Sequence, residues 1–127
     1  MTTQGDVRVY AARGASTTTF GRVLCSARDQ HFVADGPPQN GCPGEAASPA
    51  EYFLAGVASC GVELVQVLAR EHDLPLSSVE VAIEGRVDRT APVRPDVTLF
   101  NEVSVAFTLG GLSEEQAQDL VARFRRR

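Results

Sequence analysis

The order of the expected secondary-structure elements predicts an α+β fold. Three short strand-forming segments come first, one long helical segment follows, and two strands and a shorter helix complete the chain. An α/β protein would instead alternate strands with helices along its length. The chain has 127 residues, of which 43% are hydrophobic, so it can bury a core as one domain covering residues 1–127. We therefore expect antiparallel sheets packed around a central helix.

The segment before the helix is expected to form an antiparallel meander of three strands. Residues 7–11 alternate apolar and polar side chains, residues 17–25 are rich in strand-forming Thr, Phe and Val, and residues 31–34 make a short third strand. A Gly-Pro-Pro sequence ends this strand. Residues 39–47 are mainly Gly, Pro, Asn and Ala, which predicts a loop, and Cys42 lies on it.

The long helix is expected to begin at Ser48, where several start signals coincide. Ser48 can cap the helix, Pro49 suits the first helical position, and Glu51 can reach back to the Ser48 backbone as in a capping box. The helix is expected to continue to Arg70 and to end before Pro75, because the residue before a proline disfavours the helical conformation.

The side chains of this helix predict that it is mostly buried. One narrow polar stripe follows the helical spacing, and it consists of Ser59, Glu63, Gln66 and Arg70. Cys60 lies outside this stripe, so its thiol is expected to point into packed protein. Gly56 and Gly61 each weaken a helix by roughly 1 kcal/mol relative to Ala, so a second element such as another helix should approach the backbone there. So apolar a helix in one small domain favours a homodimer.

Two strands and a last helix are expected after the central helix. Apolar and polar residues alternate from Val79 to Asp88, and the alternation returns from Val97 to Leu109. Asn101 interrupts the apolar face of the second strand, which predicts a bulge or a change of environment. Ser113 and Gln116 form a second capping box. The helix that follows has a buried stripe of Ala117, Leu120, Val121 and Phe124.

The charge and composition exclude several classes of function. A formal net charge of -4 argues against nucleic acid as the main partner, because phosphate binding depends on clustered Lys and Arg. The basic cluster 123–127 is better interpreted as the complement of a helix C-terminus. No uncharged run of about 20 apolar residues and no signal peptide are found, so we expect a cytoplasmic protein with no membrane partner.

Three cysteines in a chain without a secretion signal fit a reducing compartment. Cys25, Cys42 and Cys60 are 17 and 18 residues apart, with no Cys-x-x-Cys motif and no histidine pair. We therefore expect no metal site. No glycine-rich loop that could cradle a phosphate is found either, so no bound cofactor is expected.

The residues alone leave two roles open for Cys60. A free cysteine in apolar surroundings is most often structural, whereas a nucleophile must be a thiolate stabilised by a cation or a helix N-terminus. Cys60 lies roughly 18 Å from the start of the helix, too far for the dipole to help, so another element must supply the cation. Glu51 lies about 13 Å away along the axis and on the opposite side. The two can cooperate only across a dimer interface or through a bent helix.

The helix sequence SPAEYFLAGVASC, residues 48–60, resembles a known family. It is similar to the central helix of the OsmC/Ohr family of osmotically inducible and organic hydroperoxide resistance proteins, whose pattern is roughly Ser or Asn followed by P-x-E-L-L-L-A-A-x-x-x-C. The flanking strands and the last helix also fall where that family has them. The resemblance implies an intertwined homodimer with an OsmC-like fold, in which Cys60 attacks a peroxide and becomes a sulfenic acid.

Three features differ from the pattern of the peroxidase members of this family, and the position of Glu51 is closer to that of its OsmC-like branch. Ala50 stands where the peroxidase members carry a catalytic glutamate, and Glu51 follows one position later. The arginine that would assist the thiolate falls near Thr19, and no substitute is assigned among Arg13, Arg22, Arg28 and Arg86. The family's resolving cysteine follows the last helix, and the chain stops at Arg127 before that point. We therefore expect the C-terminal end of the family fold to be absent and consider Cys42 as the resolving thiol.

The resemblance implies a thiol-dependent hydroperoxide reductase of the oxidative stress response. Its substrate would be a small organic hydroperoxide, with Cys60 and Glu51 as catalytic residues and a thiol reductant that the sequence leaves open. The alternative is a catalytically silent OsmC-like dimer that binds a small apolar ligand in the cleft between its helices.

Overall fold

The computed structural model describes residues 5–126 and consists of two compact units. The N-terminal unit ends at Tyr52, and the C-terminal unit begins at Phe53. Helix α1, Pro49–Glu71, begins in the first unit and supplies the long helix of the second. Each unit is described by itself.

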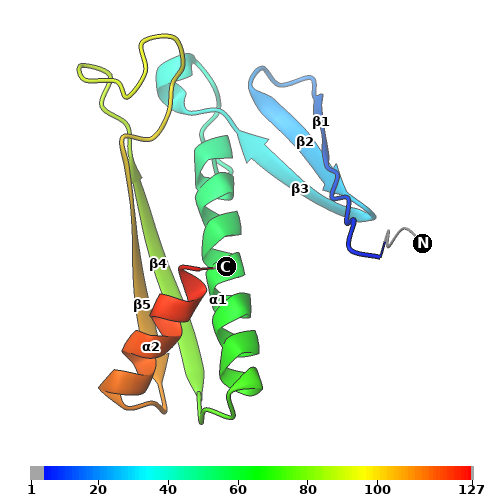
Figure 1. The fold of residues 1–127 in the computed structure, drawn as a ribbon. Helices are drawn as coiled ribbons and strands as arrows, with labels where there is room; N and C mark the ends of the chain where they lie inside the picture. The colour runs from blue at the N-terminus through cyan, green and yellow to red at the C-terminus, as the bar shows by residue number, and fades with distance from the viewer. Residues whose placement is uncertain (1–4, 127) are drawn as a thin grey trace. The chain divides into compact units, whose positions relative to one another are not determined.

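The N-terminal unit contains a three-stranded antiparallel sheet in the order β1-β2-β3 (Figure 1). Its strands are β1 (Arg13–Ser16), β2 (Arg22–Ala27) and β3 (Gln30–Asp35). The predicted meander and its third strand are therefore confirmed. A 3-10 helix, η1 (Pro38–Asn40), follows β3 within the segment that joins the sheet to α1.

The first strand starts later in the chain than the sequence predicts. Residues 7–11 form no strand, and β1 instead pairs Arg13 with Ser26 of β2. Strand β2 ends one residue further on, at Ala27. Residues 7–11 would therefore lie beyond the end of their partner, so their alternating pattern has no backbone to pair with in this sheet.

Residues 17–21 form a turn and not the predicted start of the second strand. The Thr17 hydroxyl accepts a hydrogen bond from the Thr19 amide at 3.1 Å and donates one to the Arg22 carbonyl at 3.1 Å. Gly21 has a φ of 80°, a left-handed conformation that favours glycine. Threonine favours strands by propensity, but its hydroxyl also satisfies backbone groups in turns, and here the local hydrogen bonds prevail.

The C-terminal unit packs α1 against a two-stranded antiparallel sheet and a second helix. Strand β4 (Ser78–Arg86) pairs along its whole length with β5 (Glu102–Gly110), and α2 (Glu114–Phe124) follows. Figure 1 shows α2 beside the C-terminal half of α1. The predicted strand at 79–88 and the last helix, with its Ser113 capping box, are confirmed.

The core of this unit lies where α1, α2 and the sheet meet. Its buried side chains are Val65, Leu68 and Ala69 of α1 and Leu120 of α2. Partly buried residues pack against them, namely Leu74, Leu76, Val79, Phe107, Leu109, Leu112 and Phe124. The buried stripe predicted for the last helix therefore faces this core through Leu120 and Phe124.

Strand β5 is shorter than predicted, because residues 97–101 belong to the loop that joins it to β4. Asn101 closes this loop with its side chain. Its Oδ1 accepts a hydrogen bond from the Asp88 amide at 2.7 Å, and its Nδ2 donates to the Ala91 carbonyl at 2.6 Å. The change of environment predicted at Asn101 is confirmed, and it marks the start of the strand at Glu102.

Helix α1 is much less buried than the sequence predicts. Its buried residues are Gly61, Val65, Leu68 and Ala69, on the side that faces the sheet and α2. A two-stranded sheet and one short helix cover only part of the circumference of a helix. By length and composition α1 could also cross a membrane, with a mean hydropathy of 1.6 over 18 residues. Core helices of water-soluble proteins meet the same criteria, so this property alone identifies no membrane span.

Candidate active site around Cys60

The capping box predicted at the start of α1 is present. The Ser48 amide donates a hydrogen bond to Glu51 Oε1 at 2.8 Å, and the Glu51 amide donates to Ser48 Oγ at 3.2 Å. Hydrogen bonds from the Ser48 amide, and then from its hydroxyl, hold the pKa of Glu51 below its ordinary value. Glu51 is therefore an ionised acceptor at neutral pH and already serves as part of the cap.

Tyr52 attaches the first turn of α1 to strand β3 within the N-terminal unit. Its hydroxyl donates a hydrogen bond to the Val33 carbonyl at 2.6 Å, and its ring lies 5.0 Å from that of Phe32. This contact, together with the cap, holds the first turn of α1 to β3.

An ion cluster that the sequence did not predict holds the loop before α1. Arg22 donates two hydrogen bonds to Asp35, from Nε at 2.8 Å and from Nη2 at 2.9 Å, and a third from Nη2 to Glu45 at 2.7 Å. The Asp35 carboxylate is fully buried and also accepts hydrogen bonds from the Glu45 and Ala46 amides. We call Arg22, Asp35 and Glu45 the Arg22 clamp.

The clamp determines the charge states of its members. Arg22, and then the Ala46 amide, hold the pKa of Asp35 well below its ordinary range, and Asp35, followed by Glu45, raises the pKa of Arg22. A buried carboxylate with four hydrogen bonds costs little to keep charged, whereas one without them would cost several kcal/mol. Arg22 is thus already paired with Asp35 and Glu45, which argues against it as the cation that stabilises the Cys60 thiolate.

None of the other candidate arginines is assigned as the cation that stabilises the Cys60 thiolate. Arg13 lies on the exposed strand β1, and Arg28 occupies the β2–β3 turn with a φ of 55°. Arg86 is the one candidate in the same unit as Cys60, at the end of β4. Side chains alternate along a strand, and Val81 contacts α1 at Gly61, so Arg86 lies on the sheet face away from the helix.

Cys42 follows η1 and fits between two glycines of the N-terminal unit. A Cβ on Gly21 or on Gly36 would collide with the Cys42 side chain, so both positions must lack one. The Cys42 thiol donates a weak hydrogen bond to the Asn40 carbonyl at 3.8 Å. Cys42 and Cys60 lie in different units, so their pairing as a disulfide stays a prediction.

Cys60 lies in the middle of α1, and its side chain is exposed. The prediction that its thiol points into packed protein is wrong for the single chain. The sheet covers the side of α1 that carries Gly61, about 100° around the axis from Cys60. On that covered side, a Cβ on Gly61 would lie 3.5 Å from Val81 and 3.6 Å from Phe107. A sheet and not a second helix therefore approaches this glycine.

Apolar residues surround the exposed cysteine on its own side of the helix. Phe53 is 61% exposed and Val57 is 38% exposed, and they precede Cys60 by two turns and by one turn. Gly56 lies between them, with open space where its Cβ would be. We call Phe53, Gly56, Val57 and Cys60 the Cys60 face. It offers an apolar surface next to a free thiol.

The β4–β5 loop extends this surface with a second aromatic ring. Phe100 stacks on Phe53 with ring centroids 6.1 Å apart and an interplanar angle of 27°. Phe100 also covers Gly85 of β4, where a Cβ would collide with the ring. The absence of a side chain at Gly85 therefore lets Phe100 reach the helix.

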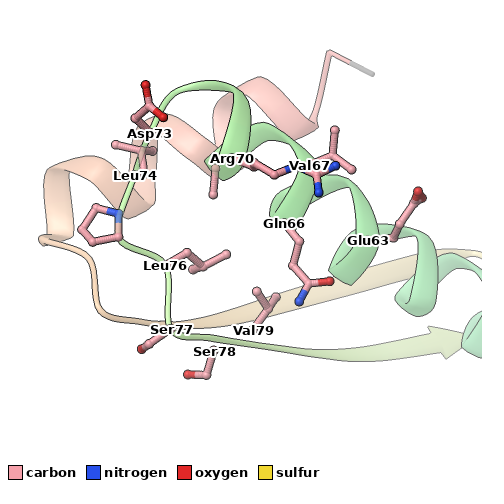
Figure 2. A pocket seen from close by; sticks show the side chains of 12 residues that line it. Glu63, Gln66, Val67, Arg70, Asp73, Leu74, Leu76, Ser77, Ser78 and Val79 are labelled. Carbon is pink, nitrogen blue, oxygen red and sulfur yellow. The ribbon is translucent and has the colours of Figure 1, made fainter.

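A cleft of about 760 Å³ opens along α1 beyond Cys60, between the helix and the segment that leads into β4. In Figure 2, Gln66 points from the helix toward Val79, Leu76 lies in the gap, and Asp73 points away from it. We call this the α1–β4 cleft. Its remaining lining residues include Glu63, Val67, Arg70, Ser77 and Ser78.

Comparison with known proteins identifies the family. A profile of the family described as OsmC-like protein matches residues 42–127. This chain belongs to the OsmC-like protein family. A search of curated protein sequences finds no match. Family membership confirms the resemblance predicted from the helix at residues 48–60.

Solved structures confirm the fold of this OsmC-like protein. It aligns with the OsmC-like protein from Mycoplasma pneumoniae with a TM-score of 0.80 at 13% identity, covering 94% of this chain and 82% of that chain. An organic hydroperoxide resistance protein from Elizabethkingia anophelis gives 0.75 at 16% identity, covering 94% and 82%. The organic hydroperoxide resistance protein OsmC from Legionella pneumophila gives 0.71 at 21% identity, covering 91% and 81%.

Within residues 5–126 of this OsmC-like protein, no three His, Cys, Asp or Glu side chains lie close enough together to hold a metal ion. Cys25 is half-buried on β2, opposite Phe32 of β3.

A signal for the Arg22 clamp was present in the sequence. Arg22 and Asp35 face each other across the β2–β3 hairpin, and a register assigned from the two strands would have paired them.

Proposed function

We propose that this OsmC-like protein is a thiol-dependent reductase of organic hydroperoxides with Cys60 as its nucleophile. The observation that supports this most is an exposed thiol on an apolar helix face, at the cysteine position of the family's helix pattern. Two solved structures with the same fold are named organic hydroperoxide resistance proteins. A role in the response to oxidative stress follows from this activity.

The proposed reaction begins with attack of the Cys60 thiolate on one peroxide oxygen. The O–O bond breaks, the other oxygen leaves as an alkoxide and takes a proton to become an alcohol, and the sulfur keeps the first oxygen as a sulfenic acid. An external thiol then restores Cys60. The Cys60 face favours substrates with an apolar organic group, because burying apolar surface contributes roughly 25 cal/mol per Å². The peroxide is the oxidant, so no bound cofactor enters the step.

Glu51 and Cys42 complete the proposed site. Glu51 is the second catalytic residue, and because nine positions of one helix separate it from Cys60, it acts on the cysteine of the partner copy. Cys42 is the candidate resolving thiol, which would form a disulfide with Cys60 only slowly.

The proposal includes a homodimer of single-domain chains, each covering residues 1–127. Helix α1 leaves Phe53 and Val57 exposed and open space above Gly56, which a second copy would cover. Obligate dimers bury more than the ~1,600 Å² of a standard interface. Light scattering at micromolar concentration should give about twice the chain mass of 13.6 kDa. We place this dimer in the cytoplasm, without membrane or nucleic-acid partners.

A second candidate function is a catalytically silent dimer that binds a small apolar ligand. The Arg22 clamp favours this alternative. Arg22 is the candidate arginine nearest in sequence to the position of the arginine in the peroxidase branch, and the clamp already pairs it with Asp35 and Glu45. Ala50 also replaces the glutamate of that branch. Without an adjacent cation to assist it, the Cys60 thiol would react more slowly with a peroxide.

Peroxide treatment and chemical trapping separate the two functions. The protein is treated with cumene hydroperoxide, trapped with dimedone and digested, and adducts are located by mass spectrometry. We expect a dimedone adduct or a sulfinic acid at Cys60, because a poorly resolved sulfenic acid is over-oxidised. A Cys42–Cys60 disulfide would establish Cys42 as the resolving thiol.

The matched control is Cys60→Ser, in which these products should be absent. If Cys60 stays reduced while Cys25 or Cys42 reacts, the reductase proposal is wrong and the silent binding protein replaces it.

A further inference from the structure

A groove of about 610 Å³ lies between β5 and α2 in the C-terminal unit, and we call it the β5–α2 groove. Small-molecule sites commonly have volumes in this range. We propose that this groove binds a medium-chain carboxylate, a molecule with one linear apolar chain and an anionic head group. The described residues that line the groove come from β5 and α2 only, so the site lies apart from Cys60 and goes beyond the proposed reductase function.

One face of each element forms a wall of the groove. On β5 the wall consists of Val105, Phe107 and Leu109, which alternate along the strand and therefore share one face of the sheet. The facing wall is one stripe of α2 at helical spacing, made of Ala117, Gln118, Val121, Ala122 and Arg125. This stripe adjoins the side of α2 that packs Leu120 and Phe124 into the core. The core packing of α2 thus turns the stripe toward β5.

The groove is open because β5 is an edge strand. Among the described residues, β5 pairs with β4 and with no other strand. Helix α2 lies beside it (Figure 1), with the rings of Phe107 and Phe124 5.2 Å apart. Val105 is nevertheless 41% exposed. An apolar chain that covers this wall would remove apolar surface from water, which is the main driving force for binding such a molecule.

Arg125 provides the site for the anionic head group. It is the one charged residue among the described residues that line the groove. Within residues 5–126 its guanidinium has no carboxylate at ion-pair distance, because the ion pairs there involve Arg22, Arg94 and Arg123. A guanidinium can bind a carboxylate through two parallel hydrogen bonds. One positive charge beside apolar walls, with no acidic residue among them, matches an apolar molecule with an anionic end.

The neighbouring arginines of α2 face Asp119 instead of the groove. Arg123 donates a hydrogen bond from Nε to Asp119 at 2.9 Å. This bond, and more weakly the charges of Arg126 and His72, lowers the pKa of Asp119. A basic residue near the C-terminus of a helix also interacts favourably with the helix dipole, but Arg126 serves that purpose as well as Arg125 does. The dipole therefore does not explain why a cation lies beside the groove.

The length of the groove indicates a chain of about eight to ten carbons. Ala117 and Arg125 lie about 12 Å apart along the axis of α2, at 1.5 Å per residue. Val105 and Leu109 lie about 14 Å apart along β5, at 3.4 Å per residue. An extended chain of about ten carbons, with C–C bonds of about 1.5 Å, has a similar length. Because α2 starts near the end of β5 and runs back along it, the carboxylate lies toward the Val105 end, at Arg125.

Binding is tested by NMR titration of the 15N-labelled protein with octanoate, below the concentration at which octanoate forms micelles. We expect saturable shift changes at the amides of residues 105–109 and 117–125, and none on the Cys60 face. Arg125→Gln should weaken octanoate binding about tenfold. The matched control Arg126→Gln removes an exposed cation one residue further on and should leave binding unchanged. No saturable shift in the groove at millimolar octanoate, or equal weakening in both variants, overturns the proposal.

The head group is tested with 1-octanol, which has the same chain without the charge. It should bind the wild type about tenfold more weakly than octanoate does, and Arg125→Gln should not change its affinity. If the wild type binds 1-octanol as tightly as octanoate, the groove recognises no carboxylate and the proposal is wrong.

The groove itself is tested with Ala122→Leu, which places a larger side chain in it. Ala122 is exposed and leucine favours helices, so the variant should keep its fold, which urea unfolding checks. It should weaken the binding of both ligands about tenfold. Unchanged binding in the folded variant would place the ligand elsewhere and refute the site. Cys60→Ser should bind octanoate like the wild type, so this outcome does not depend on whether Cys60 reacts with peroxide.

Discussion

Gly56→Ala and Gly61→Ala are a matched pair that tests how α1 packs. Both glycines lie in the interior of the same helix, but the structure gives them different surroundings. A Cβ on Gly61 meets Val81 and Phe107 at 3.5 Å and 3.6 Å, which is ordinary van der Waals contact. A Cβ on Gly56 meets nothing within 4 Å. The same substitution therefore probes a covered and an uncovered side of one helix.

The expected effect of Gly61→Ala follows from these distances. Alanine is favoured over glycine in a helix interior by about 0.8–1.0 kcal/mol. The new methyl fits against the sheet without displacing it, so we expect no steric cost to offset this gain. The free energy of unfolding should therefore rise by about 1 kcal/mol. In Gly56→Ala the same gain is expected for the single chain, but a partner copy packed on this backbone would be pushed away.

Urea unfolding at a fixed protein concentration measures the first effect. With a slope of about 1–3 kcal/mol per M, the midpoint for Gly61→Ala should rise by roughly 0.3–1 M. A fall in the midpoint would contradict the contact distances at Gly61. Light scattering over a dilution series measures the second effect. If Gly56→Ala dissociates no more readily than the wild type, the partner copy does not pack on Gly56.

Three further predictions concern the N-terminal unit. Ser48→Ala should lower the free energy of unfolding by about 1 kcal/mol through the lost cap. Glu51→Gln can keep the capping box, so the stability should be unchanged. Loss of dimedone labelling of Cys60 in this variant would make Glu51 catalytic. Unchanged labelling would make Glu51 structural. The pKa of Asp35 is lowered by folding, so its contribution is present above the unfolded pKa of about 3.9 and is lost as pH falls below it. Asp35→Asn should therefore flatten the acid limb of the stability curve below about pH 4, and an unchanged limb would exclude the clamp as its cause.

The elements that could be predicted from the sequence are those whose causes are local. The capping boxes at Ser48 and Ser113 are formed by groups three residues apart, so the sequence alone contains both partners. The period-two alternation of β4 likewise needs only one apolar face to pack against. Cys60 could be placed on the helix for the same reason, because helical spacing fixes its position relative to its neighbours.

The elements that could not be predicted depend on a partner distant in the chain. Residues 7–11 have the pattern of a strand, but the end of β2 at Ala27 leaves them unpaired. The threonine run at residues 17–19 has strand propensity, but the pairing of β1 with β2 puts it in the hairpin turn, where the Thr17 hydroxyl bonds to backbone groups. In both cases the pairing of two strands prevails over the preference of one segment.

The same distinction between local and long-range causes applies to the candidate site. The sequence determined that a cysteine lies on an apolar helix with a capped start, because spacing and capping act within a few residues. Only the tertiary structure decided which side of that helix is covered, which leaves Cys60 exposed and opens the α1–β4 cleft beyond it. The Arg22 clamp joins residues 13 and 23 positions apart, and an ion pair at such separations exists only once the hairpin and the loop have folded against each other.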